Sequence, residues 1–259
     1  MNIINFNYRV IQLMLPIYTY YIIFSIYKIF STLYIKHKNI KILKLNEQII
    51  IYNYNKNNKS IVIINGGGLL FEDTTDHVII TNVLNKLPNN NIIVIKYNLF
   101  NKFSKTSKEV IDTFNLLLKY NLNIEIFIGN SIGCSLLLEL FKVNKQFTDK
   151  KLILISPLVN FNLKYNKNIN KDAISYDLYN YIKNLFYDRE IEIDYNTLPK
   201  VFTICGSDEI FYYDIVDFNN KCKNSKLYVI DNGIHSEYIV YNFIKVRKIT
   251  NEIINFITN

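Results

Sequence analysis

The sequence predicts a single α/β domain built on an open, mostly parallel, twisted sheet with helices on both faces. Two observations carry this prediction. Short runs rich in Ile and Val alternate with longer amphipathic stretches, and the short runs show little polar alternation. Such continuous apolar runs are typical of parallel strands that helices cover on both sides. At 259 residues the chain is long enough to bury one large core of this kind.

The expected strands are the β-branched runs, and right-handed helical crossovers should join them. They cover residues 48–54, 60–66, 91–97, 124–130, 151–157, 200–206 and 226–232. Helices are expected where apolar residues recur at helical spacing, over residues 107–120, 132–145 and 236–257.

One interval is too long for an ordinary connection between neighbouring elements. Residues 158–198 contain helical pieces of their own and many tyrosines. We expect this interval to form a cap insertion over the carboxyl edge of the sheet, within a domain that spans residues 46–259.

The first 45 residues form a separate apolar segment ahead of that domain. Between Arg9 and Lys28 lie 18 uncharged residues, close to the shortest stretch that spans a bilayer. We expect membrane association through residues 10–35, with a packed or lid helix as the alternative. Lysines follow this segment, so a spanning helix would leave the domain at residues 46–259 in the cytosol. A soluble cytoplasmic protein is the alternative localisation.

Charge and cysteine content argue against several other classes of function. The net charge of +8 comes from basic residues spread along the chain, so no nucleic-acid partner is expected. The three cysteines show no paired spacing, so neither a disulfide framework nor a zinc site is indicated. We expect no metal and no cofactor.

The chain uses glycine sparingly, and the positions of its glycines point to a site. Each one falls at the carboxyl end of an expected strand or in the turn just after it, and together they are Gly66, Gly67, Gly68, Gly129, Gly133, Gly206 and Gly233. In an open parallel sheet this edge is where ligands bind.

The stretch from Gly129 to Gly133 reads Gly-Asn-Ser-Ile-Gly and joins an expected strand to an expected helix. This is the setting of a nucleophile elbow, in which a serine sits on a sharp turn between two closely packed elements. Ser131 is therefore the candidate nucleophile. The amide of Ile132 lies at a helix N-terminus, where partial positive charge favours an oxyanion.

Three further features complete a candidate serine-hydrolase site. Three consecutive glycines, at residues 66–68, expose backbone N–H groups that suit an oxyanion. His235 follows the last expected strand and is the candidate base, whereas His37 and His77 suit surface positions. Asp208 and Glu209 follow the strand before it, and either could orient the imidazole. The order serine, acid, histidine is that of the Gly-x-Ser-x-Gly hydrolases.

These residues resemble the α/β-hydrolase superfamily and, more narrowly, its hormone-sensitive-lipase-like esterases and deacetylases. The resemblance covers about residues 48–258. It implies the α/β-hydrolase fold and oxyanion donation by Gly67, Gly68 and Ile132. Its Asp-Pro-Leu position leads us to expect Asp208 as the acid. Glu209 is the alternative, because the Gly-x-x-acid spacing common in the superfamily favours it.

The sequence departs from the pattern of this branch at two positions. Asn65 stands where the His-Gly-Gly-Gly motif has its histidine, and Ile132 replaces a small residue beside the nucleophile.

The leading hypothesis is a carboxylic-ester hydrolase that acts on a small or lipid-like ester through an acyl-enzyme. An amidase or thioesterase with the same triad is one alternative. The other is a catalytically silent scaffold that serves as a membrane-tethered binding protein.

Overall fold

The computed structural model describes residues 29, 32, 33, 35–70, 75–163, 168, 171, 172, 174–236 and 243–259. Most of the apolar segment at residues 10–35 lies outside these ranges, so the expected membrane association falls on residues that are not described. Within the described part of the chain, no helix combines the length and the apolar character that a membrane span requires.

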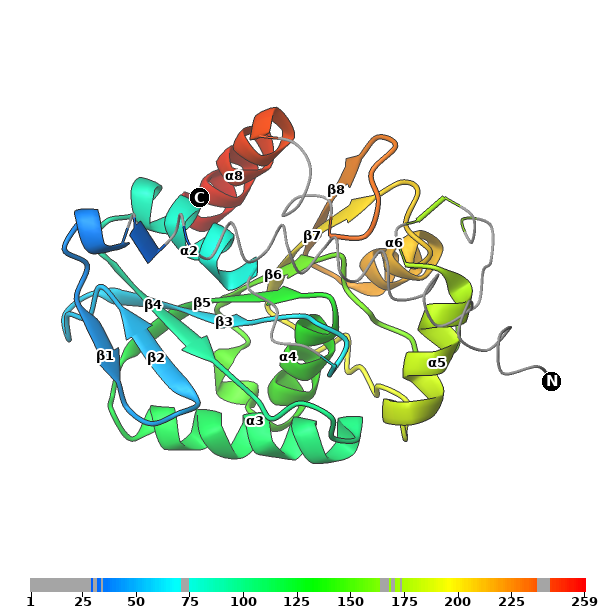
Figure 1. Cartoon of the computed structure of the whole chain (residues 1–259), viewed down its shortest axis with the longest axis horizontal. Coiled ribbons are helices and arrows are strands. Elements are labelled where there is room, and N and C mark those ends of the chain that lie inside the picture. Colours follow the sequence, from blue (N-terminus) through cyan, green and yellow to red (C-terminus); the bar gives the residue numbers. More distant parts are fainter. Residues whose placement is uncertain are drawn as a thin grey trace.

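An eight-stranded sheet forms the centre of the molecule, in the order β1-β2-β4-β3-β5-β6-β7-β8 (Figure 1). The strands are β1 (Ile42–Lys44), β2 (Ile49–Tyr52), β3 (Lys59–Ile64), β4 (Asn90–Ile95), β5 (Asn123–Asn130), β6 (Lys151–Ile155), β7 (Lys200–Gly206) and β8 (Ser225–Ile230).

Strands β3 to β8 are parallel, which confirms the expected mostly parallel sheet. Strand β2 pairs antiparallel with β4, and β1 pairs antiparallel with β2. The seven expected strands correspond to β2–β8, whereas β1 lies outside the prediction. Its three residues carry only the short pattern Ile-Leu-Lys, which is too brief for period-two alternation to stand out.

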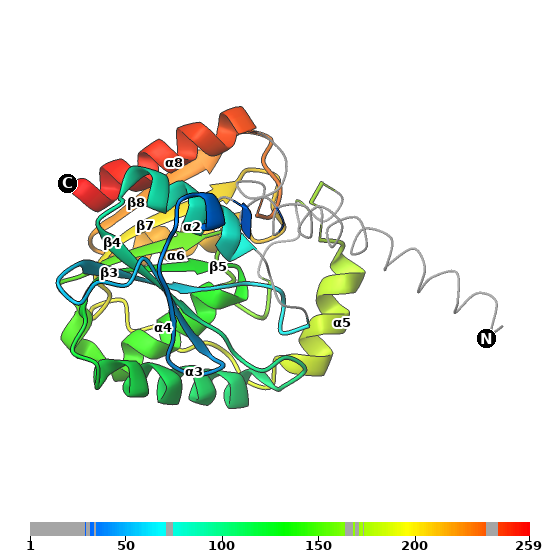
Figure 2. The same cartoon turned by 60° about the vertical axis from the view of Figure 1, so that its left-hand side comes forward.

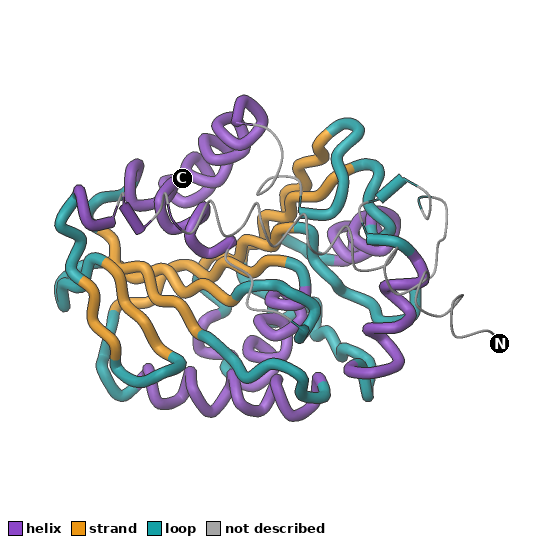
Figure 3. The backbone as a smooth tube through the Cα atoms, in the orientation of Figure 1, coloured by secondary structure: helices purple, strands orange, loops and turns teal. Residues whose placement is uncertain are grey.

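Helices cover the two faces of the sheet, as the central strands and flanking helices of Figure 3 show. They are α2 (Thr75–Lys86), α3 (Phe103–Leu118), α4 (Ile132–Val143), α5 (Tyr176–Phe186), α6 (Tyr212–Lys221) and α8 (Phe243–Thr258), together with the short 3-10 helix η1 (Lys145–Phe147). In Figure 2, α3 and α4 lie on one side of the sheet, whereas α2 and α8 lie on the other.

Each central strand contributes to two separate cores because successive side chains point to opposite faces. On β3, Val62 and Ile64 pack in the core beneath α3, α4 and α6. Ile61 and Ile63 pack in the opposite core, beneath α2 and α8. All four side chains are at most 1% exposed, which explains why this strand reads as an uninterrupted apolar run.

Helix α3 begins four residues before the expected start. Ser107, at which the sequence predicts the start of this helix, is instead a buried residue within it. The helix extends back to Phe103 because Asp188, from the interval between β6 and β7, accepts a hydrogen bond from the Ser104 amide at 3.0 Å. A tertiary contact thus supplies the cap that the local sequence lacks.

The interval in which the sequence predicts a cap insertion contains α5 and long irregular stretches. Ser175 caps α5 by accepting a hydrogen bond from the Leu178 amide. At the far end of α5 the chain is anchored to α4, where Arg189 forms an ion pair with the buried Glu139 at 2.7 Å. Tyr179, Ile182 and Phe186 of α5 are buried in the same core as side chains of α3 and α4.

Candidate active site

Ser131 lies between β5 and α4 in a strained backbone conformation, with φ 52° and ψ −121°. A positive φ is unusual for a residue other than glycine and persists only where surrounding contacts enforce it. Here the Ser131 amide donates to the carbonyl of Ile155 at 2.9 Å, and the Ser131 carbonyl accepts from the amide of Cys134 at 3.0 Å. These contacts hold the turn and leave the hydroxyl free to meet a base.

The two glycines around Ser131 are required by close backbone approach. A Cβ on Gly129 would lie 2.9 Å from the Cα of Cys134 in α4. A Cβ on Gly133 would lie only 2.2 Å from the carbonyl oxygen of Ile64, at the end of β3. Side chains at these positions would separate α4 from β5 and β3, so the Gly-x-Ser-x-Gly spacing follows from packing.

The structure brings His235 to Ser131 from a position 104 residues further along the chain, with His235 Nε2 at 2.9 Å from Ser131 Oγ. The imidazole is only 7% exposed and packs edge-on against the ring of Phe211. This is the distance at which a base can accept the hydroxyl proton.

Glu209, rather than Asp208, lies beside the second ring nitrogen of His235. Its Oε2 is 3.4 Å from His235 Nδ1, and its side chain is fully buried. Asp208 instead forms an ion pair with Lys171 at 3.2 Å, at the molecular surface. The sequence prediction leaned toward Asp208, and the reason for the difference is the turn after β7, which directs only the second of the two acids inward.

Two further donors fix the Glu209 carboxylate. Its Oε1 accepts the Gly206 amide at 2.6 Å and the Ser156 hydroxyl at 2.6 Å. Burial raises the pKa of Glu209, and its contact with His235 opposes that rise. Ser156 also accepts the amide of Ser236 at 2.9 Å, so one hydroxyl ties the acid to the loop that carries the histidine.

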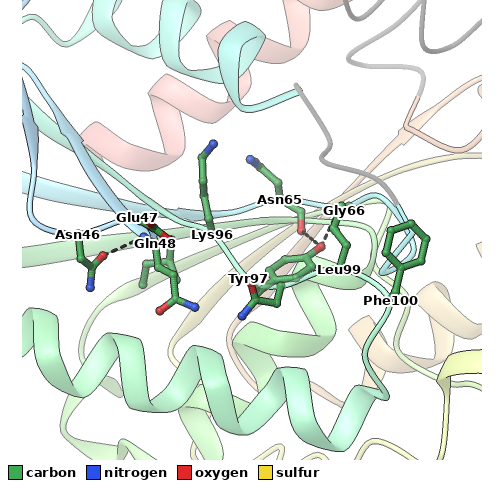
Figure 4. Close-up of a pocket in the computed structure, with 11 residues that line it drawn as sticks. Asn46, Glu47, Gln48, Asn65, Gly66, Lys96, Tyr97, Leu99 and Phe100 are labelled. Atoms are coloured by element: carbon green, nitrogen blue, oxygen red, sulfur yellow. Dashed lines mark hydrogen bonds between the residues drawn. The ribbon is translucent and has the colours of Figure 1, made fainter.

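The glycine loop, residues 66–68, follows β3, and its backbone includes positive φ angles that favour glycine. Gly67 and Gly68 have φ values of 100° and 62°, which L side chains rarely adopt. Tyr97, after β4, donates its hydroxyl toward the carbonyls of Asn65 and Gly66, at 3.1 Å and 2.6 Å (Figure 4). This tyrosine thereby ties the start of the glycine loop to the end of β4.

The expected third donor, Ile132, is the first residue of α4, and its side chain is fully buried. Its apolar bulk therefore lies in the core beneath the elbow. Asn65, which stands in the histidine position of the family motif, has a buried Oδ1 without a hydrogen-bond partner among the described residues.

An open pocket of about 850 Å³ begins at the glycine loop and extends along the ends of β2 and β4. It is lined by Asn46, Glu47, Gln48, Asn65, Gly66, Ile95, Lys96, Tyr97, Asn98, Leu99 and Phe100, most of which Figure 4 labels. The lining is mixed in character, with amide and charged groups toward β2 and with Leu99 and Phe100 at the other end.

The other two histidines belong to other segments of the chain. His37 is exposed near the start of the described chain, and His77 falls in α2 at a position whose side chain is not described. Within the described ranges, no group of three or more His, Cys, Asp and Glu side chains is arranged to hold a metal ion.

Sequence reasoning did not single out Ser156, Tyr97 or Asp172 as parts of the site. Ser156 occurs in the Leu-Ile-Ser-Pro-Leu stretch at residues 154–158, and its φ of 45° marks a sharp turn at the end of β6. Asp172 lies between β6 and α5 and accepts the His235 amide at 2.8 Å. No local pattern signals either contact, because both partners are more than 50 residues away.

Comparisons with known proteins identify a matching family and similar folds. The family model described as steryl acetyl hydrolase (Say1_Mug180) matches residues 25–201. A search of curated proteins gave no match. Among solved structures, the chain is similar to carboxyl esterase 2 from the mycorrhizal fungus Tuber melanosporum, with a TM-score of 0.74, 14% identity and 85% of each chain covered.

Two other solved structures are similar at comparable levels. A hormone-sensitive lipase from a metagenome library has a TM-score of 0.69 and 18% identity, with 84% of this chain and 82% of that chain covered. An esterase/lipase from an uncultured bacterium has a TM-score of 0.67 and 15% identity, with 85% of each chain covered. The α/β-hydrolase fold and the resemblance to hormone-sensitive-lipase-like esterases are thereby confirmed.

The matched residues 25–201 make up more than half of the chain and include the glycine loop and Ser131. Glu209 and His235 follow the matched range. The protein therefore belongs to the steryl acetyl hydrolase family and is a carboxylic-ester hydrolase with the α/β-hydrolase fold.

Proposed function

We propose that this protein hydrolyses an acetyl or other short acyl ester of a bulky apolar alcohol, with Ser131, His235 and Glu209 as its catalytic triad. The single observation that carries the proposal is the 2.9 Å contact between Ser131 Oγ and His235 Nε2 at a strained strand-to-helix turn. The family description, steryl acetyl hydrolase, supports the choice of ester.

The first half of the reaction forms an acyl-enzyme. Ser131 Oγ attacks the ester carbonyl carbon while its proton passes to His235 Nε2. The carbonyl oxygen becomes an oxyanion, which the amides of Gly67, Gly68 and Ile132 receive. When the tetrahedral intermediate collapses, the carbon–oxygen bond to the alcohol breaks, and the imidazolium returns its proton to the departing alkoxide.

The second half repeats these steps with water. His235 takes a proton from water as it attacks the acyl carbon, and the imidazolium then protonates Ser131 Oγ as the carboxylic acid leaves. Glu209 stays ionised throughout and stabilises the imidazolium from the Nδ1 side. Because both side chains are buried, solvent screens this interaction little.

The substrate is tested with p-nitrophenyl acetate, butyrate and decanoate and with an acetylated sterol presented in detergent. We expect the highest kcat/KM for the acetyl esters and at least a 10³-fold lower kcat in Ser131→Ala. An unchanged rate in Ser131→Ala would refute the triad. A preference for decanoate, or for the matching amides or thioesters, would refute the substrate class while leaving the triad intact.

We also propose that the chain associates with membranes through residues 10–35. The support is the sequence itself, in which 18 uncharged residues precede five lysines spread over residues 28–44. Fractionation of the full-length protein and of a chain that begins at residue 46 tests this proposal. Recovery of both in the supernatant would contradict it and would favour the soluble alternative.

A further inference from the structure

The insertion between β6 and β7 contributes a carboxylate that touches both of the loops that carry the proposed acid and base. Asp172 Oδ1 accepts the backbone amide of His235 at 2.8 Å. Asp172 Oδ2 accepts the backbone amide of Ile210, the residue after Glu209, at 2.9 Å. One side chain thus satisfies an amide from each loop with separate oxygens.

A second insertion residue reinforces the same junction. Asn168 is 5% exposed, and its Nδ2 donates to the carbonyls of Ser207 and Glu209 at 2.8 Å and 3.0 Å. The insertion therefore binds two carbonyls and one amide of the loop that carries Glu209. It also binds one amide of the loop that carries His235. The loops also meet directly, since the Asp208 amide donates to the Gly233 carbonyl at 2.8 Å.

The geometry points to Asp172 as a positioning residue that holds His235 and Glu209 in register, an inference that rests on the proposed function of those two residues. Asp172 touches only backbone groups of the two loops in these bonds, so it acts through them. The hydrogen bonds are charge-assisted, which makes them about twice as strong as neutral ones. Nothing else in the described insertion bridges both loops with one side chain.

This arrangement gives the insertion a second role besides that of covering the sheet edge. A displacement of about 1 Å between a base and its partner costs on the order of 10²-fold in rate. The separation between His235 Nδ1 and Glu209 Oε2 is already 3.4 Å, so the triad has little tolerance for further loosening. Movement of the insertion would thus change the alignment of the catalytic base.

Asp172 also adds a negative charge near the imidazole. Among the described residues, the charged groups around His235 are Glu209, Asp172 and the Lys171–Asp208 ion pair. A nearby negative charge favours the imidazolium over the neutral ring. Loss of the Asp172 charge should therefore move the acid limb of the kcat/KM profile to lower pH.

The test compares Asp172→Ala and Asp172→Asn with a matched control, Asp188→Asn. Asp188 belongs to the same insertion and also accepts a backbone amide. Its donor is Ser104, at the start of α3, and not a residue of the loops that carry Glu209 and His235. We expect Asp172→Ala to lower kcat by at least 10-fold with KM changed by less than about 3-fold. Asp172→Asn keeps one good acceptor, so its loss should be smaller, and its acid limb should move to lower pH. Asp188→Asn should match the wild type in kcat and in its pH profile.

Amide hydrogen exchange gives a readout that does not depend on activity. In Asp172→Ala the peptides that contain Ile210 and His235 should exchange faster than in the wild type, whereas in Asp188→Asn they should not. If both Asp172 variants keep wild-type kcat, pH profile and exchange, the inference is wrong. If the wild type lacks esterase activity, the proposed function fails, and exchange alone then decides whether Asp172 joins the loops.

Discussion

Replacing Glu209 with Gln tests whether Glu209, rather than its neighbour Asp208, is the catalytic acid. We expect the substitution to lower kcat while it maintains or raises the thermal stability. The two donors on Oε1, from Gly206 and Ser156, require an acceptor oxygen there. The substituted side chain would keep its oxygen at that position and present its NH₂ group to His235 Nδ1. Two donors cannot face each other, so the imidazole would adopt the tautomer with its proton on Nε2, which cannot accept the Ser131 proton.

The size of the activity loss follows from the geometry. In serine proteases the equivalent change costs about 10⁴-fold in kcat. The 3.4 Å separation in this protein is longer than an ordinary hydrogen bond, so the acid contributes less in this arrangement. We expect a loss of about 10³-fold, or about 4 kcal/mol of transition-state stabilisation.

Stability should respond in the other direction. Burial raises the pKa of Glu209 above its ordinary value of 4.5, so the native state holds this proton more tightly than the unfolded chain does. The ionised carboxylate therefore destabilises the fold increasingly as pH rises from about 4.5 through the folded pKa. Glu209→Gln removes this cost, so its Tm should equal or exceed that of the wild type at pH 7, and the difference should shrink toward pH 4.

The assay is steady-state hydrolysis of p-nitrophenyl acetate, with Asp208→Asn as the control and thermal denaturation at pH 4 and pH 7 alongside. Asp208→Asn should stay within about 3-fold of the wild type, because its ion pair with Lys171 is exposed. A larger loss in Asp208→Asn than in Glu209→Gln would refute the assignment of the acid. A lower Tm for Glu209→Gln at pH 7 would refute the reasoning about its buried charge.

Three further substitutions test the surroundings of the site. Gly133→Ala places a methyl group against the last carbonyl of β3, which should cost about 1–3 kcal/mol in chemical denaturation and also lower kcat by moving the glycine loop. Tyr97→Phe removes the hydroxyl that holds two carbonyls of that loop, so kcat should fall about 3- to 10-fold with KM unchanged, as a loss of about 1 kcal/mol predicts. Arg189→Ala leaves the buried Glu139 without its partner and should cost about 3 kcal/mol in urea denaturation, whereas a loss below about 1 kcal/mol would show that solvent already screens the pair.

The strand-to-helix elbow at Ser131 could be predicted from the sequence because its signal is local. Gly129 is needed for a contact within this strand–turn–helix unit, and Gly133 is needed for the close approach of α4 to the end of β3, so their spacing reflects the packing around the elbow. The parallel core could be predicted for a similar reason, since burial on both faces leaves an uninterrupted apolar run in each strand. The antiparallel direction of β2 could not, because an apolar run has no direction.

The choice between Asp208 and Glu209 depends on contacts between distant segments. Both follow β7, and the sequence gives each a rationale. Only the folded turn shows that Glu209 points inward to accept the Gly206 amide, while Asp208 faces Lys171. The contribution of Asp172 was invisible for the same reason, since its partner His235 is 63 residues away.

The most direct test of the account is mass spectrometry of the protein after reaction with a fluorophosphonate probe. If the base at 2.9 Å activates Ser131, the wild type should carry one covalent adduct on the peptide that contains Ser131. Labelling should vanish in Ser131→Ala and slow by at least 10²-fold in His235→Ala. An adduct that persists in Ser131→Ala, or a wild type that does not react, would contradict the central claim.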